Sequence, residues 1–288
     1  MSAPLQRACT FLFVPGNRPE RFRKAFDAGA DAVILDLEDA VAPADKTMAR
    51  AAIAEAWATF SADERARLVV RINPAGTPWH ADECDWVSRL DGLGAVMWPK
   101  AEDAADLARL AAQVPVLALI ETALGLSRAR ELAATPGVLR LGLGQIDLQA
   151  DLGMVCGPDE AELLPARFEL VLASRLARMT PPIDGVTMDT RDASVCIEDT
   201  RRSRRLGFGA KLCIHPQQVA CARQAFAPSA DQIDWATRVV QAVAAARGGV
   251  CTVDHKMVDA PVLKLAEQTL WQAGIDPSQL HNQEMTCE

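Results

Sequence analysis

The chain has 288 residues, half of which are hydrophobic, and its formal net charge is −8 at pH 7. This length fits one large α/β barrel or two ordinary domains, and the apolar content is ample for a sizeable core. The acidic balance gives no basic field for nucleic acid, and no apolar segment is long enough to span a bilayer, so we expect neither nucleic acid nor a membrane as a partner.

The N-terminus and the cysteines indicate the cellular compartment. The first residues, MSAPLQRACTFLF, lack the pattern of a signal peptide. The eight cysteines are scattered without a C-x-x-C pair, which favours reduced thiols over disulfides or a zinc site. Tyrosine is absent, so a tyrosine acid–base mechanism is excluded. We therefore expect a soluble, cytoplasmic protein.

Strand-like and helix-like segments alternate along the chain. The apolar runs that predict strands are Cys9–Val14, Ala32–Leu37, Leu68–Ile72, Ala95–Trp98, Val116–Ile120, Leu139–Leu143, Ile183–Met188 and Ala210–Ile214. The amphipathic segments between them include Pro19–Ala28, Lys46–Thr59, Asp82–Leu90, Ala101–Ala112, Thr122–Ala134, Asp159–Ala177 and Ser194–Leu206. Such alternation predicts an α/β fold, a (β/α)8 TIM barrel. An open doubly wound sheet is the rival, but a Gly-rich dinucleotide fingerprint is missing after the first strand.

The pattern changes after Pro228, which predicts a barrel over residues 1–228 and a C-terminal helical extension over 229–288. Within the extension, the sequence predicts a long helix, a Gly pair that could act as a hinge, an irregular loop and a final helix. Their ranges are Asp231–Arg247, Gly248–Gly249, Val250–Pro261 and Val262–Gln272. The polar residues from about Pro277 onward are expected to be frayed.

In a TIM barrel the carboxyl ends of the strands carry the chemistry. In this sequence nearly every predicted strand ends in a polar or ionisable residue, whereas the helix-to-strand loops contain no such series. The residues at these ends are Asn17, Asp36, Glu38, Asp39, Arg71, Asn73, Lys100, Glu121, Asp147, Asp189 and His215. This asymmetry indicates an enzyme.

Two acids follow neighbouring strands in the middle of the chain. Glu121 follows Val116–Ile120, and Asp147 lies in a predicted loop after Leu139–Gly144. A buried carboxylate needs a cation beside it, and Mg²⁺ usually takes one or two protein carboxylates. The alternative is a pair of acids that form salt bridges with nearby Arg or Lys. The other polar residues at the strand ends favour the metal.

Two cations lie among these acids. Arg71 can bind the carboxylate of a small α-keto or α-hydroxy acid through its planar guanidinium, or it can be a structural partner of Glu38 or Glu121. Lys100 can form a Schiff base, as in some aldolases, or pair with Glu38 and Asp36. Pairing is favoured, because surrounding acids raise the pKa that a Schiff-base lysine must lower.

Other candidate residues give weaker signals. Arg18, Arg21 and Lys24 are three residues apart at the start of the first predicted helix, so they form either an anion site or a solvated basic face. His215 is a lone histidine, a type that is more often structural than functional. Asp259 is a loop acid, and such residues are ordinarily solvated.

Several motifs together resemble the citrate lyase β-subunit family within the HpcH/HpaI aldolase/citrate lyase superfamily, which includes malyl-CoA and citramalyl-CoA lyases. The matching stretches are FLFVPGNRPERFRKA, GADAVILDLEDAVAPADK, VVRIN, MWPK, LIETALGL, LGLGQIDLQADLG, GFGAKLCIHPQQV and VDHKMVDAP. They cover nearly the whole chain, and their combination is highly specific.

The resemblance implies a barrel with Mg²⁺ bound to Glu121 and Asp147 and with Arg71 on the substrate's oxygens. It places CoA phosphates near the basic residues of the first helix, which are Arg18, Arg21 and Lys24. The residues expected around the metal ligands are Asp36, Glu38, Asp39 and Lys100.

The resemblance also assigns a general acid/base to the C-terminal loop, where it corresponds to Asp259 acting in a neighbouring subunit's site. Homotrimers or trimer-based hexamers are expected. Some members have an aromatic hydroxyl where Phe13 stands and a smaller or acidic residue where Gln145 stands, and these are departures from the family pattern. The presence of the C-terminal loop favours free CoA thioesters as substrates.

The sequence thus predicts a Mg²⁺-dependent lyase that cleaves or forms a β-hydroxyacyl-CoA, with acetyl-CoA and a 2-keto acid as the fragments. The alternatives are a Schiff-base aldolase that uses Lys100, the β subunit of a citrate lyase complex that acts on a carrier-protein thioester, and a non-catalytic CoA-binding subunit. The sequence selects neither the acyl group nor the direction of the reaction.

Overall fold

A computed structural model describes residues 4–246 and 251–280. The chain divides into two compact units, Met1–Phe226 and Ala227–Glu288. Among the described residues, the structure contains no helix with the length and apolarity needed to cross a membrane.

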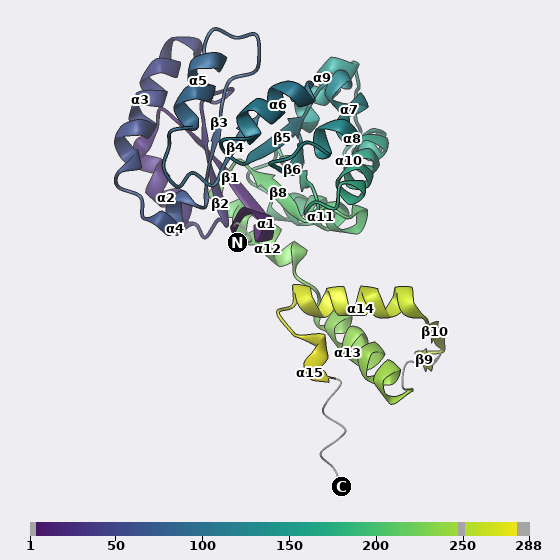
Figure 1. Ribbon diagram of the computed structural model, residues 1–288. Coiled ribbons are helices and arrows are strands. Elements are labelled where there is room, and N and C mark those ends of the chain that lie inside the picture. Colours follow the sequence, from purple (N-terminus) through teal and green to yellow (C-terminus); the bar gives the residue numbers. More distant parts are fainter. Residues whose placement is uncertain (1–3, 247–250, 281–288) are drawn as a thin grey trace. The chain divides into compact units, whose positions relative to one another are not determined.

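The first unit is a closed barrel of eight parallel strands, which confirms the predicted TIM barrel (Figure 1). The strands follow one another around the barrel in sequence order, and β8 closes it by pairing with β1. They are β1 Thr10–Pro15, β2 Ala32–Asp36, β3 Leu68–Arg71, β4 Ala95–Trp98, β5 Val116–Ile120, β6 Val138–Leu143, β7 Ile183–Asp184 and β8 Ala210–Cys213.

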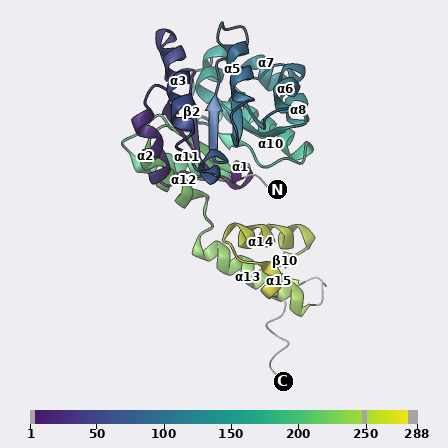
Figure 2. The same ribbon diagram turned by 60° about the vertical axis from the view of Figure 1, so that its left-hand side comes forward.

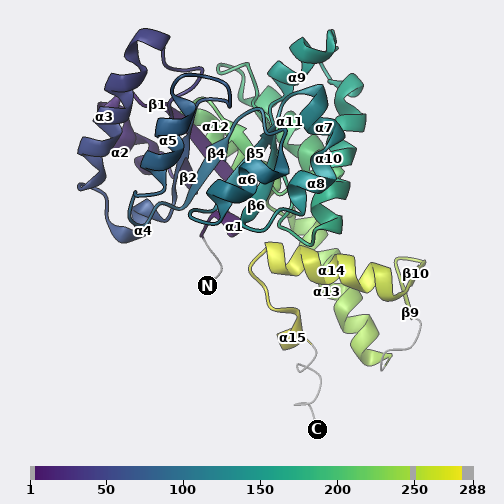
Figure 3. The same ribbon diagram turned by 45° about the horizontal axis from the view of Figure 1, so that its top comes forward.

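Helices surround the barrel, as two further views show (Figures 2 and 3). The longer helices are α2 Phe22–Asp27, α3 Lys46–Trp57, α5 His80–Val87, α6 Ala104–Ala111, α7 Ala123–Ser127, α8 Ala129–Ala133, α9 Gln145–Leu152, α10 Leu164–Leu176, α11 Ala193–Leu206 and α12 Pro216–Phe226. The short elements are α1 Pro4–Arg7, η1 Pro19–Arg21, η2 Pro43–Asp45, α4 Ala62–Arg65 and η3 Ala161–Leu163.

Two predicted helical details are wrong. The segment Thr122–Ala134 is not one helix, because Arg128 leaves helical geometry at φ −106° and ψ 9° and separates α7 from α8. Asp147 lies in helix α9 rather than in a loop. This helix buries few apolar side chains, Leu148 among them, so its sequence gave little periodicity to detect.

The barrel interior changes from apolar to charged along each strand. Side chains alternate between the two faces of a strand, so Ile34 and Asp36 share the inward face of β2, and Val69 and Arg71 share that of β3. Ile34 and Val69 belong to an apolar layer inside the barrel, together with Phe11, Met97, Leu117, Leu119 and Leu212. The charged residues continue this inward face at the carboxyl ends of the strands.

At the amino end of the barrel, Leu5 of α1 is buried against the apolar layer. The guanidinium of Arg140 is buried there and donates to the carbonyls of Pro181 at 2.9 Å, Ala8 at 2.7 Å and Leu5 at 3.3 Å. Burial lowers the pKa of Arg140 to about 9. These contacts join the segment before β1 to the bottom of the barrel, so this end has a structural role.

The second unit contains two long helices and a hairpin. Its elements are α13 Ala230–Ala245, β9 Cys251–Val253, β10 Lys256–Val258, α14 Ala260–Gln272 and α15 Pro277–Leu280. Its own core includes Val239, Val240, Val253, Val258 and Leu270.

The prediction of an irregular loop over Val250–Pro261 is wrong, because β9 and β10 pair as an antiparallel hairpin. The turn residues Asp254 and His255 have φ of 50° and 61°, the left-handed geometry that a two-residue hairpin turn requires. Each of these strands has only three residues, so the alternation of apolar and polar side chains was too short to predict a strand. The predicted hinge Gly248–Gly249 lies outside the described residues.

Candidate functional site

The carboxyl end of the barrel holds a cluster of charged side chains, which we call the rim cluster. Its members are Asp36, Glu38, Asp39, Arg71, Lys100, Glu121 and Asp147. On one side, Asp36 and Arg71 are paired neighbours on β2 and β3. Nε and Nη2 of Arg71 each donate to Asp36 at 2.7 Å. Asp36 also accepts from the backbone N–H of Glu38 at 2.9 Å, so it shapes the turn after β2.

The third guanidinium nitrogen of Arg71 faces the remaining acids. Nη1 lies 2.8 Å from Oε2 of Glu38 and 3.4 Å from Oδ2 of Asp39. The pairing with Glu38 that the sequence left open as an alternative is therefore present. The centre of the Phe13 ring lies 4.6 Å from the guanidinium carbon of Arg71, so this ring packs against the guanidinium. A ligand can meet Arg71 through Nη1, where Asp39 is the more exposed of its two partners.

Glu121 is held between two backbone segments. Lys100 has φ 47°, and its backbone N–H donates to Oε1 of Glu121 at 2.8 Å. On the other side, a Cβ at Gly144 would overlap the Glu121 carboxylate. Only glycine leaves room for this close approach. That Gly144 makes room for Glu121 was not predicted, because the two residues are far apart in the sequence.

The side chain of Lys100 brings three acids together. Its Nζ lies 3.1 Å from Asp147, 3.4 Å from Glu38 and 3.7 Å from Glu121. The predicted pairing with Glu38 is confirmed, but the predicted pairing with Asp36 is wrong, because both oxygens of Asp36 bind Arg71. Burial lowers the pKa of Lys100, but the charges of the three acids outweigh it and raise the pKa above its usual value. A raised pKa disfavours a Schiff-base role.

Acids outnumber cations in the rim cluster, and two of them resist ionisation. Burial raises the pKa of Glu121 to about 8, with further increases from the charges of Glu38 and Asp147. Burial also raises the pKa of Glu38 to about 7, against the charges of Arg71 and Lys100. A divalent cation would supply the missing positive charge.

The donor set fits a hard cation that keeps most of its coordination for water and substrate. Across residues 4–246 and 251–280, no group of three or more His, Cys, Asp or Glu side chains has metal-binding geometry. Mg²⁺ commonly uses only one or two protein carboxylates. Glu121 and Asp147, which meet on the same ammonium group, could provide them.

Further residues hold the backbone on either side of Glu38, and most of them were not predicted from the sequence. Nζ of Lys46 donates to the carbonyls of Leu37 and Glu38, each at 2.9 Å. Nδ2 of Asn73 donates to the same Leu37 carbonyl at 3.0 Å and to Glu83 at 2.8 Å. Lys46 and Glu83 lie on helices and resemble ordinary charged helix residues, so no signal in the sequence distinguished them.

The predicted phosphate-binding residues lie on the surface at the start of the first helical segment. Arg18, Arg21 and Lys24 are exposed, and Nε of Arg18 donates to Glu20 at 2.7 Å. The segment begins with the 3-10 helix η1 rather than as the continuous helix expected over Pro19–Ala28. A role in binding CoA stays a prediction.

Three further candidates have structural contacts. Asp259 caps α14 by accepting from the N–H of Val262 at 3.1 Å, and its proposed catalytic role stays a prediction. The His215 ring accepts from the N–H of Gln217 at 3.3 Å. Gln145 forms hydrogen bonds with both backbone groups of Val186, and these bonds fix the start of α9 to the segment after β7.

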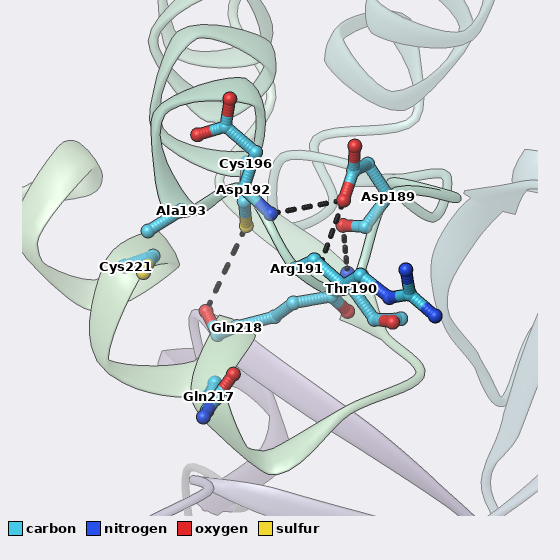
Figure 4. A pocket seen from close by; sticks show the side chains of 9 residues that line it. All are labelled: Asp189, Thr190, Arg191, Asp192, Ala193, Cys196, Gln217, Gln218 and Cys221. Carbon is cyan, nitrogen blue, oxygen red and sulfur yellow. Dashed lines mark hydrogen bonds between the residues drawn. The ribbon is translucent and has the colours of Figure 1, made fainter.

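Asp189 borders a small pocket near the start of α11 (Figure 4). Its carboxylate accepts from the N–H groups of Arg191 at 2.7 Å and Asp192 at 2.9 Å, which makes it a turn residue. The pocket has a volume of about 20 Å³, and Cys196 and Gln218 also line it. It has room for a single water molecule and not for a substrate.

Comparison with known proteins places this geometry in a family. The sequence profile of the HpcH/HpaI aldolase/citrate lyase family matches residues 9–216, which span the barrel from β1 to the start of α12. The chain belongs to this family. The resemblance inferred from the sequence motifs is therefore confirmed.

The relatives differ in the activity that their names give. A citrate lyase subunit beta-like protein of Mycobacterium tuberculosis is 40% identical over 272 residues, which cover 92% of this chain and 95% of the relative. A (3S)-malyl-CoA thioesterase of Cereibacter sphaeroides is 35% identical over 268 residues, with coverages of 91% and 93%. The family thus indicates an enzyme related to the citrate lyase β subunit without fixing the reaction.

A solved structure extends the similarity to the three-dimensional fold. The crystal structure of CitE from Mycobacterium tuberculosis, in complex with magnesium, acetoacetate and coenzyme A, matches with a TM-score of 0.82 and 38% identity. The match covers 93% of this chain and 99% of CitE.

Proposed function

We propose that this protein is a Mg²⁺-dependent carbon–carbon lyase that cleaves, or forms, a β-hydroxyacyl-CoA of the citramalyl-CoA, malyl-CoA or citryl-CoA type. The products of cleavage are acetyl-CoA and a 2-keto acid. The observation that carries this proposal is the convergence of Glu121 and Asp147 on one cationic group at the carboxyl end of the barrel. The complex of CitE with magnesium, acetoacetate and coenzyme A supports it.

In this proposal Glu121 and Asp147 hold the magnesium ion, with Glu38 and Lys100 beside them. When bound, magnesium supplies a Lewis acid that polarises and orients the oxygens of the hydroxy or keto acid. Backbone contacts from Lys100 and the absence of a side chain at Gly144 fix the Glu121 carboxylate before any ligand binds. Such fixed ligands reduce the reorganisation that binding requires.

Cleavage breaks one C–C bond, removes the proton of the substrate hydroxyl and adds a proton to the carbon of the enolate. The hydroxyl of the substrate gives its proton to water and becomes the carbonyl of the keto acid, while the electrons of the broken C–C bond form the enolate of the acetyl thioester. Asp259 of a neighbouring subunit serves as the general acid that gives a proton to the enolate carbon, and the reverse transfer serves condensation. Nη1 of Arg71 binds the substrate carboxylate and stabilises the negative charge that develops nearby.

The exposed cations of the first helical segment bind the CoA phosphates. Arg18, Arg21 and Lys24 are exposed, so the phosphates can reach them without displacing buried groups. Because Asp259 would come from another copy, the active form is an oligomer, and the family resemblance implies a homotrimer or a trimer-based hexamer.

A second candidate is hydrolysis of the thioester, which the malyl-CoA thioesterase relative favours. A third is action on a carrier-protein thioester as the β subunit of a citrate lyase complex. Non-catalytic CoA binding is a fourth, although it gives no reason for the paired carboxylates at the rim.

One experiment separates these candidates. The purified protein is incubated with a panel of acyl-CoA esters and Mg²⁺, and the products are identified by mass spectrometry. A lyase releases acetyl-CoA and a keto acid, whereas a thioesterase releases free CoA and a hydroxy acid. If free CoA esters remain unchanged but a carrier-bound thioester is cleaved, the citrate lyase subunit is the correct assignment. CoA binding without turnover of either substrate would overturn the proposal.

A further inference from the structure

Lys100 is unusual in both its backbone and its side chain. Its φ of 47° lies in the left-handed region, which a residue with a Cβ adopts only when surrounding contacts hold it there. The backbone N–H of Lys100 donates to Glu121 at 2.8 Å, and this hydrogen bond holds the backbone in that conformation. The side chain of Lys100 approaches the same acid. The backbone therefore directs the ammonium group into the rim cluster.

The ammonium group contacts the same carboxylates that are the proposed magnesium ligands. Nζ lies 3.1 Å from Asp147 and 3.7 Å from Glu121, and Glu38 at 3.4 Å completes its surroundings. The side chain remains 35% exposed, so it has a path to solvent. It can leave the acids without moving through the packed barrel interior.

Resting on the proposed magnesium site, we propose that Lys100 and the divalent cation compete for the carboxylates of Glu121 and Asp147. Lys100 is then a positioning residue, which holds these acids together and lowers their affinity for the ion. When the ion binds, the ammonium group either leaves the carboxylates or stays and repels the ion. Both events oppose binding, so the sign of the effect does not depend on where Lys100 moves.

The test is the affinity for Mg²⁺ alone, measured by titration calorimetry at pH 9 to limit competition from protons. Lys100→Met keeps the length of the side chain and removes its charge, and we expect it to bind Mg²⁺ at least ~10-fold more tightly than the wild type. Lys100→Arg keeps the charge and is expected to gain no affinity. Lys264→Met, an exposed change on α14, is the matched control and should bind as the wild type does. Equal or weaker binding by Lys100→Met would overturn the competition.

Failure of this inference can be distinguished from failure of the proposed function. If wild-type protein binds no Mg²⁺, or if Glu121→Ala binds it unchanged, the magnesium site itself is wrong. If the wild type binds, Glu121→Ala does not, and Lys100→Met gains nothing, only the competition is wrong.

The thermal midpoint gives an independent measurement, which also serves if Lys100→Met is unstable without the ion. Removal of Lys100 leaves the three acids without their shared cation, so Mg²⁺ should raise the midpoint of Lys100→Met more than that of the wild type. For a variant that folds only with Mg²⁺, chelator titration of the loaded protein gives the affinity. A smaller rise in the variant, or faster loss of the ion to the chelator, contradicts the proposal.

Discussion

Two ionic clusters with buried acids lie in the same barrel, and they differ in charge balance. The second cluster, which we call the β7–β8 cluster, consists of Glu160, Arg167, Asp184, Ser203 and Lys211. Asp184 accepts from Nε of Arg167 at 3.1 Å and from the hydroxyl of Ser203. Arg167 also pairs with Glu160 at 2.5 Å, and Nζ of Lys211 donates to the carbonyl of Gly185 at 2.8 Å.

The pKa of a buried acid shifts in opposite directions in the two clusters, upward for Glu121 and downward for Asp184. Burial opposes ionisation of Asp184, yet Lys211, Arg167 and the hydroxyl of Ser203 outweigh it and lower the pKa of Asp184. In the rim cluster burial prevails, and the pKa of Glu121 rises to about 8. Cations and hydrogen bonds match the acid charge in the β7–β8 cluster, so it needs nothing further. The rim cluster retains excess acid, which is typical of a site that binds a cation or moves a proton.

The largest expected effect is on catalysis at the rim. Glu121→Ala or Asp147→Ala should reduce turnover by at least ~10³-fold, because a metal that stabilises the reacting oxygens contributes several kcal/mol. Steady-state kinetics with an active acyl-CoA ester measure this effect. Circular dichroism should show an intact fold. Near-normal turnover in either variant contradicts the metal assignment.

In the β7–β8 cluster the expected effect is on the stability of the fold rather than on catalysis. Arg167→Met removes one partner of a buried pair and should lower the free energy of unfolding by ~3–5 kcal/mol. Urea denaturation measures the change. Activity per folded molecule should stay near wild type, and a selective loss of activity would show that the two clusters do not differ in role.

The rim should also give stability a distinctive pH dependence. The ordinary pKa of a glutamic acid is 4.5, and burial in the folded protein raises the pKa of Glu121 to about 8, so the folded state binds this proton more tightly than the unfolded state. Its contribution is complete below pH 4.5 and is lost as the pH rises through about 8, on the order of a few kcal/mol without Mg²⁺. Thermal unfolding of the wild type and Glu121→Gln across this range tests it. The variant should show a flatter profile, and an equal slope would exclude Glu121 as the source.

Gly144 offers a way to disturb the rim without changing its charge. Gly144→Ala should displace the Glu121 carboxylate and weaken Mg²⁺ binding by ~10–100-fold, as loss of ligand support commonly does. Calorimetry measures the affinity. Gly157→Ala, at a position where an added Cβ meets no atom closer than 3.5 Å, is the control. Unchanged affinity in Gly144→Ala means that the close approach has no part in the site.

The smallest expected effect concerns the exposed cations. Arg18→Ala should raise the KM for a CoA ester only ~3–5-fold at low salt, because exposed ion pairs contribute little and are screened. The kcat should not change, since these residues lie outside the reacting centre. Kinetics at two salt concentrations measure the effect, and a KM that is insensitive to salt contradicts phosphate binding.

The sequence alone was enough to predict the barrel and the set of residues at its carboxyl end. Both are encoded locally, because an apolar run followed by an amphipathic segment specifies a β/α unit, and a polar residue just after the run must lie at the strand's end. For this reason Glu121 and Asp147 could be placed at the carboxyl end of the barrel without knowing which side chains surround them in the fold.

Which charged side chains pair with one another depends on the three-dimensional fold. Asp36 rather than Glu121 holds Arg71, Lys100 spans three acids, and Gly144 makes room for a carboxylate 23 positions earlier in the chain. These contacts join separate strands, and their partners depend on strand register and on distances of a few ångströms. The same local pattern of acid and base fits several pairings, so only closure of the barrel selects one.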